Sequence, residues 1–568
     1  MTDDIGELLT QFEQARFIVG HNILGFDLPA LERYHALDVE SLVAANKVLD
    51  TLLVARQCDP PRAGGVDGGR YSLGSLGARL VGKSKLEDAD DTLLKSLAEE
   101  YGGYDAIPTN DDRYRAYAAQ DVELTRQIAA KLRIDGYARR EHTVMWRVGQ
   151  IERSGLRVDI DAAEQRIEAQ RRLLDRDFQR LRDIAGVPLR GKAPHLQAAG
   201  KAAIAATFQR LGVDPPRTKK GALALNQEAL SQLVEHHPGN TGVNELVDIL
   251  QKVGRQRTFA ETVLKHVSHD RVHPAIRADQ ATGRISVTKP GLTTMGKRER
   301  QLVLERALIL PDTDDEVLIA ADLSQIDARA MAVLSGDPRY IRAFAEEEDY
   351  HSAMAEALFG AHEWNRAGHH PRRSEAKVVV HATTYGMGAL GLSKAAGIDE
   401  NEAKRLLERL DMQFPALASY KRVIRETAEK KQVLRTPHGR TVRIEPGREW
   451  TQAPAAMGQG TARDLMMDGI LRLPNWLASR LRLIVHDEVV LSVPRDRIDE
   501  ASTALLDALQ FDFSVSSGST VPVRAGLSAP GRDWADCYRD EVPWPETAWE
   551  HRQQDSCDDP ECTWHEEL

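Results

Sequence analysis

Residues 316–325, EVLIAADLSQ, and residues 480–493, RLRLIVHDEVVLSV, are the stretches that decide the fold. Each contains an apolar run of strand length with an aspartate at its edge, Asp322 in the first and Asp487 in the second. In the second stretch the polar triplet His486-Asp487-Glu488 interrupts two apolar runs, as a hairpin turn does. The pattern therefore predicts strands that hold two carboxylates rigidly while leaving them within reach of solvent.

Two carboxylates that meet in a folded protein repel each other unless cations lie between them. Mg²⁺ suits such a place, because it binds one or two carboxylates together with the phosphates of a substrate. This is the layout of a two-metal site for phosphoryl transfer. The alternative is that Asp322 and Asp487 are ordinary acids at the ends of strands that lie far apart.

The segment between the two aspartates favours the first interpretation. Residues 372–388, RRSEAKVVVHATTYGMG, place Arg373, Lys377, His381 and Tyr385 four residues apart. On a helix such positions share one face, so two cations would be followed by two rings. This face suits a nucleoside triphosphate, with the cations on its phosphates and a ring on its base. The alternative is a solvated basic turn followed by a packed aromatic side chain.

Three segments resemble, in this order, the polymerase motifs of family A DNA polymerases, the group of bacterial DNA polymerase I and many phage replicative enzymes. They are DLSQIDAR at 322–329, RRSEAKVVVHATTYGMGALGL at 372–392 and VHDEV at 485–489. Further segments are similar to the same family: ATGRIS at 281–286, DYHSAMAEALFG at 349–360, TPHGRTVRI at 436–444 and GQGTARDLMMD at 458–468. The resemblance runs from about residue 141 to residue 538.

The resemblance implies which residues carry the chemistry. Asp322 and Asp487 would hold two Mg²⁺ ions, for which Mn²⁺ could substitute, and the backbone carbonyl of Leu323 would be a further ligand. Glu488 would lie beside this catalytic site. Lys377 would protonate the departing pyrophosphate, which makes it a catalytic residue as well as a substrate-binding one.

The resemblance also implies the contacts to substrates, which are deoxynucleoside triphosphates and primer-template DNA. Arg373, Lys377 and His351 would bind the triphosphate, and Tyr385 would lie near the templating base and the nucleotide sugar. Further nucleotide contacts would come from Gln325, Asp327 and His381. Contacts to DNA would come from Arg284, Gln459, Arg329 and His486, with Arg284 and Gln459 on the minor-groove side, where every base pair offers similar acceptors.

Three positions depart from the family pattern. Asp327 stands where the family usually has Glu, so we expect a looser exclusion of a ribose 2′-hydroxyl, and His381 stands at a position usually held by Phe or Tyr. Ala455 replaces a common Asn. None of these changes removes an expected metal ligand.

The N-terminal region resembles the proofreading 3′–5′ exonuclease of the same family. HNILGFDLPAL at 21–31 places Asp27 like its second motif, and YAAQDVELT at 117–125 places Tyr117 and Asp121 like its third. The chemistry also needs an Asp-x-Glu pair on a first strand well upstream, and only 26 residues precede Asp27. We therefore expect a late start codon or a structural remnant, and weak or absent proofreading.

The implied fold is a multidomain α+β protein, a right-hand polymerase with palm, fingers and thumb that follows a ribonuclease H-like α/β exonuclease domain lacking its first strands. The expected segments are 1–135 for the truncated exonuclease-like domain, 139–270 for the thumb with the start of the palm, 271–335 for the first part of the palm, 336–450 for the fingers, 451–538 for the second part of the palm and 539–568 for an acidic tail.

Composition agrees with this organisation. The chain has 568 residues and a net charge of −11, but residues 540–568 hold ten acids and one base, whereas residues 139–220 hold 18 Lys and Arg against 10 Asp and Glu. The second region could follow a phosphate backbone or be a solvated helical face. Four cysteines, no secretory leader and no long apolar run predict a cytoplasmic monomer, within a host cell if phage-encoded, without membrane contact and with unidentified replisome partners.

Cys557, Cys562 and His565 lie close together in the tail, but three such residues in an acidic stretch are more often incidental than a zinc site.

DNA synthesis in phage replication is the leading functional hypothesis, and two other functions are alternatives to it. A single-subunit RNA polymerase has a similar palm, yet Asp327 and the exonuclease-like region speak against it. A catalytically silent DNA-binding protein would need to lose a carboxylate, and Asp322 and Asp487 are both present.

Overall fold

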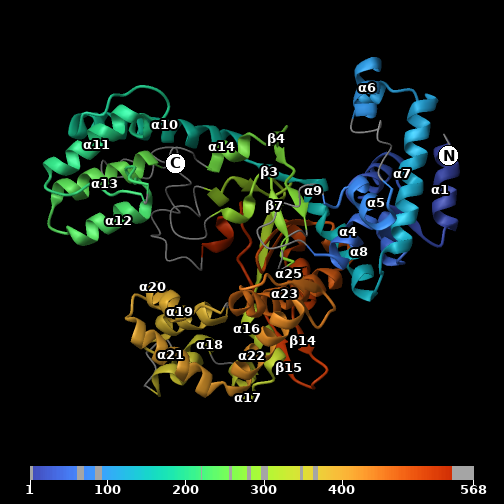
Figure 1. The fold of residues 1–568 in the computed structure, drawn as a ribbon. Coiled ribbons are helices and arrows are strands. Elements are labelled where there is room, and N and C mark those ends of the chain that lie inside the picture. Colours follow the sequence, from blue (N-terminus) through green and yellow to red (C-terminus); the bar gives the residue numbers. More distant parts are fainter. Residues whose placement is uncertain are drawn as a thin grey trace. The chain divides into compact units, whose positions relative to one another are not determined.

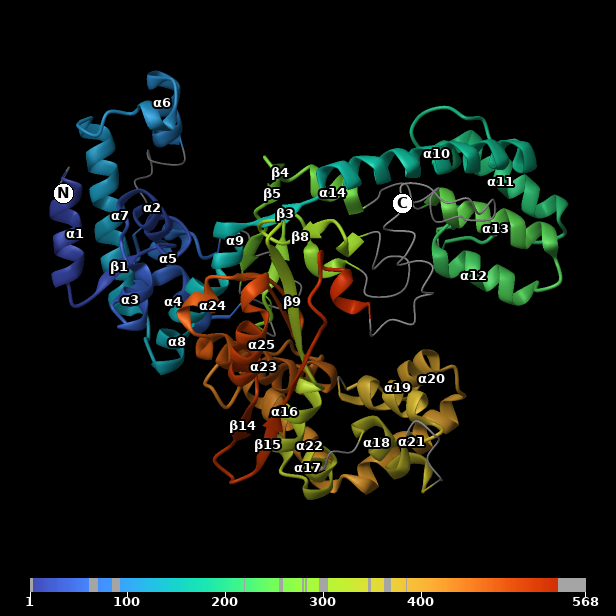
Figure 2. The same ribbon diagram turned by 180° about the vertical axis from the view of Figure 1, so that it is seen from behind.

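The structure is a computed structural model with a mixed α+β fold (Figures 1 and 2). It describes residues 4–60, 70–83, 92–218, 220–254, 259–277, 280, 283–295, 305–345, 349–361, 369–384 and 386–539. The chain divides into unit 1, which comprises Met1–Gly155, Pro274–Thr293 and Asp315–Pro530, and unit 2, which comprises Leu156–His273, Thr294–Asp314 and Gly531–Leu568. In the described part of the chain, no helix is long and apolar enough to cross a membrane.

A four-stranded antiparallel sheet with the order β12-β13-β9-β16 is the centre of unit 1. Its strands are β9 (Glu316–Leu323), β12 (Leu481–Val485), β13 (Glu488–Pro494) and β16 (Ala525–Leu527). Strands β9, β12 and β13 are buried along nearly their whole length, as their continuous apolar runs predict. Helix α25 (Ile498–Leu509) packs on β9, β13 and β16, and α23 (Glu449–Arg472) packs on α25.

A helical block follows β9, as Figure 1 shows. Its first two helices are α16 (Ile326–Ser335) and α17 (Pro338–Ala345), and α18 (Tyr350–Phe359) then packs against α19 (Arg373–Thr384). The block continues with α20 (Ala389–Ala396), α21 (Glu400–Gln413), α22 (Pro415–Lys431) and the hairpin of β10 (Val433–Arg435) and β11 (Thr441–Arg443). Unit 1 also contains the hairpins β6 (Ala275–Arg277) with β7 (Ser286–Thr288) and β14 (Phe511–Ser514) with β15 (Thr520–Val523), and the short helix α24 (Asn475–Ala478).

The N-terminal part of unit 1 holds two short parallel strands, β1 (Ile18–Gly20) and β2 (Val48–Asp50). Leu28, Val43 and Trp146 pack with β1 and β2 in one apolar core. The helices of this part are α1 (Ile5–Gln14), α2 (Asp27–His35), α3 (Val39–Ala44), α4 (Thr51–Cys58), α5 (Leu73–Val81), α6 (Thr92–Tyr101), α7 (Asp112–Lys131), α8 (Gly136–Val148) and α9 (Gln150–Ser154).

Unit 2 combines a small sheet of order β4-β5-β3-β8 with a helical subdomain. The strands are β3 (Leu156–Val158), β4 (Val267–Ser268), β5 (Arg271–Val272) and β8 (Ile309–Leu310). The helices are α10 (Ile160–Ala185), α11 (Ala198–Arg210), α12 (Gln227–His236), α13 (Thr241–Gly254) and α14 (Phe259–Leu264). The longest helix described in unit 2 is α10, which begins after the N-cap Asp159 and is followed by the C-cap Gly186, whose φ of 67° is in the left-handed region that favours glycine.

Candidate active site

The two aspartates that the sequence singles out lie side by side on the central sheet. Asp322 is the penultimate residue of β9, and Glu488, the residue after Asp487, is its direct partner on β13. The backbone N–H of Leu323 also donates a 2.9 Å hydrogen bond to the carbonyl of Asp487. The register of β9 and β13 therefore brings Asp322 and Asp487 into one neighbourhood.

The predicted hairpin turn is present between β12 and β13. His486 and Asp487 form the turn, and His486 has a φ of 56°, in the left-handed region. Because Asp487 belongs to the turn, it stays partly accessible, with 28% of its side chain exposed, whereas Glu488 belongs to the strand and is buried. Directly paired residues point to the same face of a sheet, so Glu488 lies beside Asp322.

The site concentrates negative charge. Burial raises the pKa of Asp487 to about 7, and the nearby carboxylates of Asp327 and Asp322 act in the same direction, whereas the Arg284 guanidinium opposes them. Clustered carboxylates with a raised pKa favour a bound cation. Among the described residues no group of three or more His, Cys, Asp or Glu side chains is arranged to hold a metal ion. Two carboxylates are nonetheless the protein ligands that Mg²⁺ uses together with substrate phosphates.

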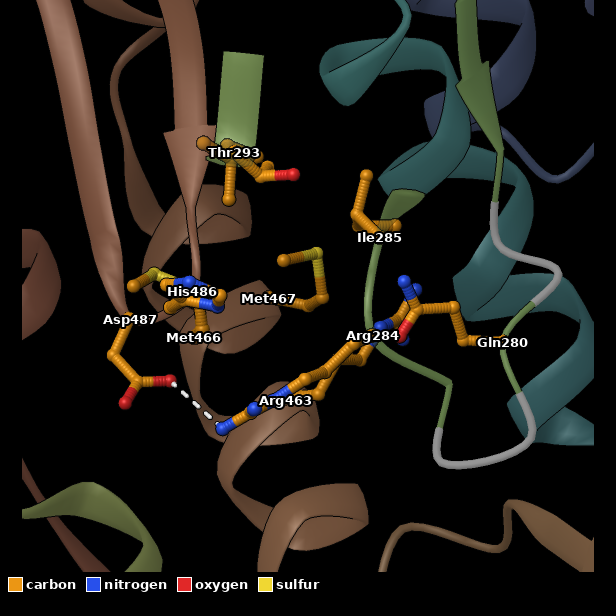
Figure 3. A pocket seen from close by; sticks show the side chains of 10 residues that line it. Gln280, Arg284, Ile285, Thr293, Arg463, Met466, Met467, His486 and Asp487 are labelled. Carbon is orange, nitrogen blue, oxygen red and sulfur yellow. Dashed lines mark ion pairs between the residues drawn. The ribbon is translucent and has the colours of Figure 1, made fainter. Parts of the chain in front are cut away.

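Arg284 precedes β7 and contacts this acidic group. Its Nη2 atom lies 3.3 Å from Oδ2 of Asp327, on the first turn of α16, and 4.0 Å from Oδ1 of Asp487 (Figure 3). Asp327 was expected to help exclude a ribose 2′-hydroxyl, and Tyr385, which was expected near the nucleotide sugar, lies outside the described residues. Thus the structure pairs an expected DNA-binding arginine with an expected nucleotide-binding acid.

Beside Asp487 is a cavity of about 100 Å³ (Figure 3). Its charged, imidazole and amide side chains come from three segments: Gln280 and Arg284 between β6 and β7, Arg463 on α23, and His486 and Asp487 in the turn between β12 and β13. Its remaining walls are Ile285, Thr293, Met466, Met467 and Ile484. Gln459 lies half-buried on α23, the helix that also carries Arg463.

The predicted cationic face is formed by α19. Lys377 and His381 are exposed on it and Arg373 is partly exposed, whereas Ala376 and Val380 are buried on the other side. Each expected side chain that the structure describes here therefore lies on the accessible face. The fourth expected residue, Tyr385, follows the helix outside the described residues.

Asp349 fixes the first cation of this face. It accepts hydrogen bonds from Nε and Nη2 of Arg373 at 2.6 and 2.8 Å, a bidentate pair. Asp349 is also the N-cap of α18, since its carboxylate accepts a 2.8 Å hydrogen bond from the N–H of Ser352. The same carboxylate thus positions both α18 and the guanidinium of Arg373.

His351, on the first turn of α18, belongs to the same electrostatic group. Burial, together with the nearby charges of Arg373, Lys377 and His381 and against the opposing charge of Asp349, lowers its pKa to about 4. The expected triphosphate-binding residues therefore lie near one another, with His351 neutral at pH 7. A neutral imidazole offers a hydrogen-bond donor to a phosphate and adds no positive charge.

Two expected site residues lie around the start of α16. Gln325 is exposed and has a φ of 47°, between β9 and the helix. Arg329, expected to contact DNA, is buried instead, and it donates hydrogen bonds to the carbonyls of Ser324 and Pro522 at 2.8 and 2.6 Å. Burial lowers the pKa of Arg329 to about 10. In this structure the guanidinium of Arg329 joins the start of the helix to β15.

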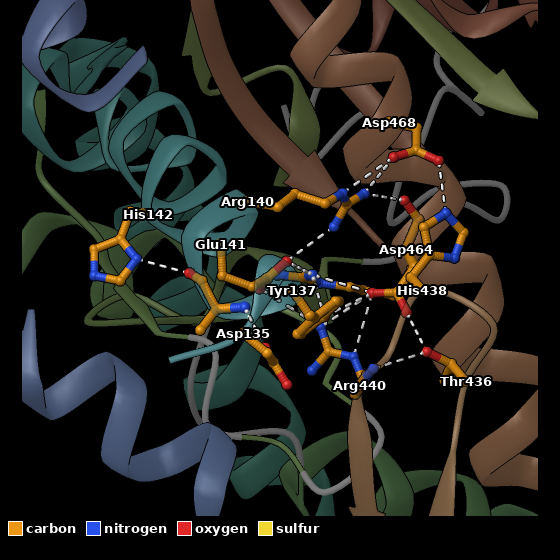
Figure 4. Close-up of polar contacts among 12 residues, drawn as sticks. Asp135, Tyr137, Arg140, Glu141, His142, Thr436, His438, Arg440, Asp464 and Asp468 are labelled. Atoms are coloured by element: carbon orange, nitrogen blue, oxygen red, sulfur yellow. Dashed lines mark hydrogen bonds and ion pairs between the residues drawn. The ribbon is translucent and has the colours of Figure 1, made fainter. Parts of the chain in front are cut away.

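A buried ionic network that sequence reasoning missed joins α8 to α23 (Figure 4). Asp464 accepts hydrogen bonds from the hydroxyls of Tyr137 and Thr436, each at 2.8 Å, and from the Arg440 guanidinium at 3.2 Å. Glu141 accepts a 2.7 Å hydrogen bond from Arg463. The sequence signals were Arg440 and Asp464 inside family-like segments, whereas nothing marked the buried acid on α8.

A second part of the network lies at the next turn of α23. Nε2 of His438 lies 2.8 Å from Oδ2 of Asp468, and Arg140 donates hydrogen bonds to Oδ1 of the same carboxylate. Through these contacts, α8 and the β10–β11 hairpin hold the helix that carries Gln459.

The expected exonuclease residues of the N-terminal region lie on two helices, α2 and α7. Asp27 is the first residue of α2, and burial together with the charge of Asp50 raises its pKa. Asp50, at the end of β2, is buried and accepts hydrogen bonds from the N–H groups of Asn22, Leu24 and Leu52. Asp50 thus has a structural role. Tyr117 and Asp121 lie one turn apart on α7.

Comparison with known proteins gives a consistent result. The sequence model of the family described as DNA polymerase family A matches residues 193–536. The DNA polymerase of Mycobacterium phage D29 is 27% identical over 488 residues, which cover 83% of this chain and 77% of the phage protein. DNA polymerase I of Chloroflexus aurantiacus is 29% identical over 454 residues, or 74% of this chain and 46% of that protein. The chain thus spans about half the length of that bacterial relative.

A solved structure has a similar fold. It is the POL domain of Pol1 from M. smegmatis in complex with DNA primer-template and dNTP, with a TM-score of 0.66 and 21% sequence identity. The similarity covers 86% of this chain and 82% of that chain.

Proposed function

Because the chain belongs to DNA polymerase family A, we propose that it adds deoxynucleotides to a primer 3′-hydroxyl on a DNA template. The central sheet is the palm in this proposal, the helical block from α17 to the β10–β11 hairpin the fingers, and the helical part of unit 2 the thumb. The observation that carries the proposal is the register of β9 and β13, which brings Asp322 and Asp487 together. The likeness to the phage D29 enzyme supports a role in phage replication.

The acidic group suits two divalent cations, Mg²⁺ or Mn²⁺. Asp322, Asp487 and the carbonyl of Leu323 are the oxygen donors that would hold them, and Glu488 is the buried acid beside them. Such ions activate the primer hydroxyl and neutralise charge on the reacting phosphates. The raised pKa of Asp487 supports this assignment, because bound cations would stabilise the ionised carboxylate against the burial and the repulsion that raise its pKa.

Residues of the fingers would bind and orient the incoming triphosphate. Arg373 and Lys377 supply positive charge to its phosphates, and neutral His351 supplies a hydrogen bond. Lys377 is exposed on α19 and is the group proposed to donate a proton to the departing pyrophosphate. Gln325, His381 and Tyr385 are the proposed contacts to the sugar and base.

Contacts to DNA would come from Arg284, Gln459 and His486 near the primer end, and from the thumb along the duplex. Arg171 and Arg172 are exposed next to each other on α10, which supports a phosphate contact there. The acid at position 327 would act on the sugar, as proposed from the sequence, once Arg284 turns to DNA.

Weak or absent proofreading is the proposal for the N-terminal region. Asp27, Tyr117 and Asp121 are its expected site residues. Asp50, the acid whose charge helps to raise the pKa of Asp27, accepts three backbone hydrogen bonds and so has a structural role. A primer with a 3′ mismatch and Mg²⁺ tests this point, since rapid removal of the terminal nucleotide would refute it.

Primer extension with Mg²⁺ tests the polymerase proposal. Asp487→Asn should abolish extension while leaving duplex affinity within about twofold, because the change removes one ligand charge and no proposed DNA contact. Asp512→Asn is the matched control, an exposed aspartate on β14 that should extend like the wild type. Supplying ribonucleotides in place of deoxynucleotides separates DNA synthesis from RNA synthesis. Full activity of Asp487→Asn would refute the proposal.

A further inference from the structure

Arg463 is a buried guanidinium for which the proposed mechanism has no use. It lies on α23 one turn after Gln459, and only 3% of its side chain is exposed. Its Nη1 atom makes every hydrogen bond that the structure gives it: to Glu141 at 2.7 Å, to Tyr137 at 3.2 Å and to Asp464 at 3.3 Å. Two carboxylates therefore balance its charge.

The other side of the guanidinium has no such contacts. Nε and Nη2 of Arg463 are buried and have no hydrogen-bond partner among the residues that the structure describes. Buried donors without acceptors are unfavourable, and they are rare in folded proteins unless a ligand or water completes them. Arg463 also lines the cavity beside Asp487, together with Arg284 (Figure 3). The missing acceptor therefore has a place to bind.

The chemistry of this cavity selects its occupant. Charge on Arg463 is already balanced by Glu141 and Asp464, so its remaining donors suit neutral acceptors better than a phosphate. Met466 and Met467 give the cavity apolar walls. Purine N3 and pyrimidine O2 atoms are neutral acceptors on a flat, largely apolar edge, and every base pair presents them at similar positions in the minor groove.

The network that holds Arg463 also sets the position of Arg284. Arg440 contacts Asp464, and its guanidinium packs against Gly283, where a Cβ atom would lie 2.0 Å from Nη1. Gly283 immediately precedes Arg284 and has a φ of 80°. Asp464 thus holds Arg463 directly and Arg284 indirectly, through Arg440, and both Arg463 and Arg284 line the same cavity.

We propose that Arg463 is a second minor-groove sensor, which donates from Nε and Nη2 to a purine N3 or pyrimidine O2 atom of the primer-template pairs nearest the primer 3′ end. This inference rests on the proposed polymerase function. It assigns Arg463 to a different contact from that of Arg284, so that the cavity senses the shape of the duplex through two arginines.

Arg463→Lys separates this role from the structural one. A lysine ammonium keeps a positive charge beside Glu141 and Asp464 but lacks the donor pair at Nε and Nη2. The probe is a primer in which 3-deazaguanine replaces guanine at the first, second or third position from the 3′ end, which removes the N3 acceptor. Single-turnover extension is measured for each primer with the wild type, Arg463→Lys and the control Arg472→Lys, which makes the same change on α23 away from the cavity lining.

We expect one position at which 3-deazaguanine slows the wild type and Arg472→Lys by about tenfold or more, the loss typical of a hydrogen bond to a charged donor. Arg463→Lys should show no further loss at that position and keep the wild-type losses at the others. Equal losses in wild type and Arg463→Lys at every position would overturn the inference. A wild type that extends no primer would instead overturn the proposed function.

A second measurement does not depend on the folding of an Arg463 variant. In the double variant Arg284→Ala and Gln459→Ala, the proposal requires that one position remain sensitive to 3-deazaguanine. Loss of sensitivity at all three positions would show that Arg284 and Gln459 make every such contact, and would refute a role for Arg463.

Discussion

Replacing Asp464 by Asn should strongly destabilise unit 1. The Asp464 carboxylate is fully buried and accepts hydrogen bonds from Tyr137, Thr436 and Arg440, with Arg463 at 3.3 Å. An amide of the same shape removes the charge and leaves Glu141 to balance two buried guanidinium groups. Breaking a buried ion pair in this way costs about 3–5 kcal/mol of unfolding free energy.

Urea unfolding followed by tryptophan fluorescence is the assay, since Trp146 is buried on α8, the helix that carries Tyr137 and Glu141. Asp468→Asn is the matched control at the next turn of α23. Its side chain is 22% exposed, so we expect a loss of only about 1 kcal/mol. The reasoning would be refuted if Asp464→Asn were as stable as the wild type or no less stable than Asp468→Asn.

The difference in unfolding free energy between wild type and Asp464→Asn should depend on pH in a predictable direction. Arg440 and Arg463 overcome the effect of burial and hold the pKa of Asp464 at about 2, below its ordinary 3.8. Because the folded-state pKa is lowered, the carboxylate stabilises the protein above about pH 4, and this contribution is lost as the pH falls towards 2. The stability difference between wild type and Asp464→Asn should therefore shrink across that interval.

Three further perturbations test other parts of the account. Asp349→Asn should raise KM for deoxynucleotides about fivefold in steady-state extension, because the first cation of α19 loses its bidentate anchor, and an unchanged KM would count against that anchor. His351 has its pKa lowered to about 4, so the wild type should lose stability relative to His351→Gln as the pH falls from about 6.5 to 4, and parallel pH profiles in thermal unfolding would contradict its burial. Gly283→Ala places a Cβ atom against Arg440 and should cost more than about 2 kcal/mol, whereas Gly518→Ala, with φ of 87° and no neighbour within 4 Å, should cost about 1 kcal/mol in the same urea assay. Equal losses for the two alanines would exclude the close approach.

Periodicity and apolar runs predicted the parts of the fold that depend on local sequence. The hairpin at Asp487 and the helix that carries Arg373, Lys377 and His381 are present as predicted, because a polar interruption or a four-residue repeat is visible in one short segment. The juxtaposition of Asp322 and Asp487 could be expected only by resemblance to a family, since register between distant strands has no local signal.

The contacts between buried charges could not be predicted. Glu141 and Asp464 are more than 300 residues apart in the chain, and their shared cations become evident only when α8 packs on α23. Arg329 looked like an available cation in a motif, yet folding buries it against backbone carbonyls. Single-residue properties do not reveal which charges tertiary packing removes from solvent.

We propose that Asp322 and Asp487 act as one unit in nucleotide addition. The most direct test of this proposal is the single-turnover extension rate of Asp322→Asn, Asp487→Asn and the double variant, each with saturating Mg²⁺ and duplex. Residues that act as a unit have non-additive effects, so each single change should lower the rate by about a thousandfold or more and the double change should lower it little further. Single variants that keep more than about a tenth of the wild-type rate, or losses that multiply in the double variant, would contradict the account.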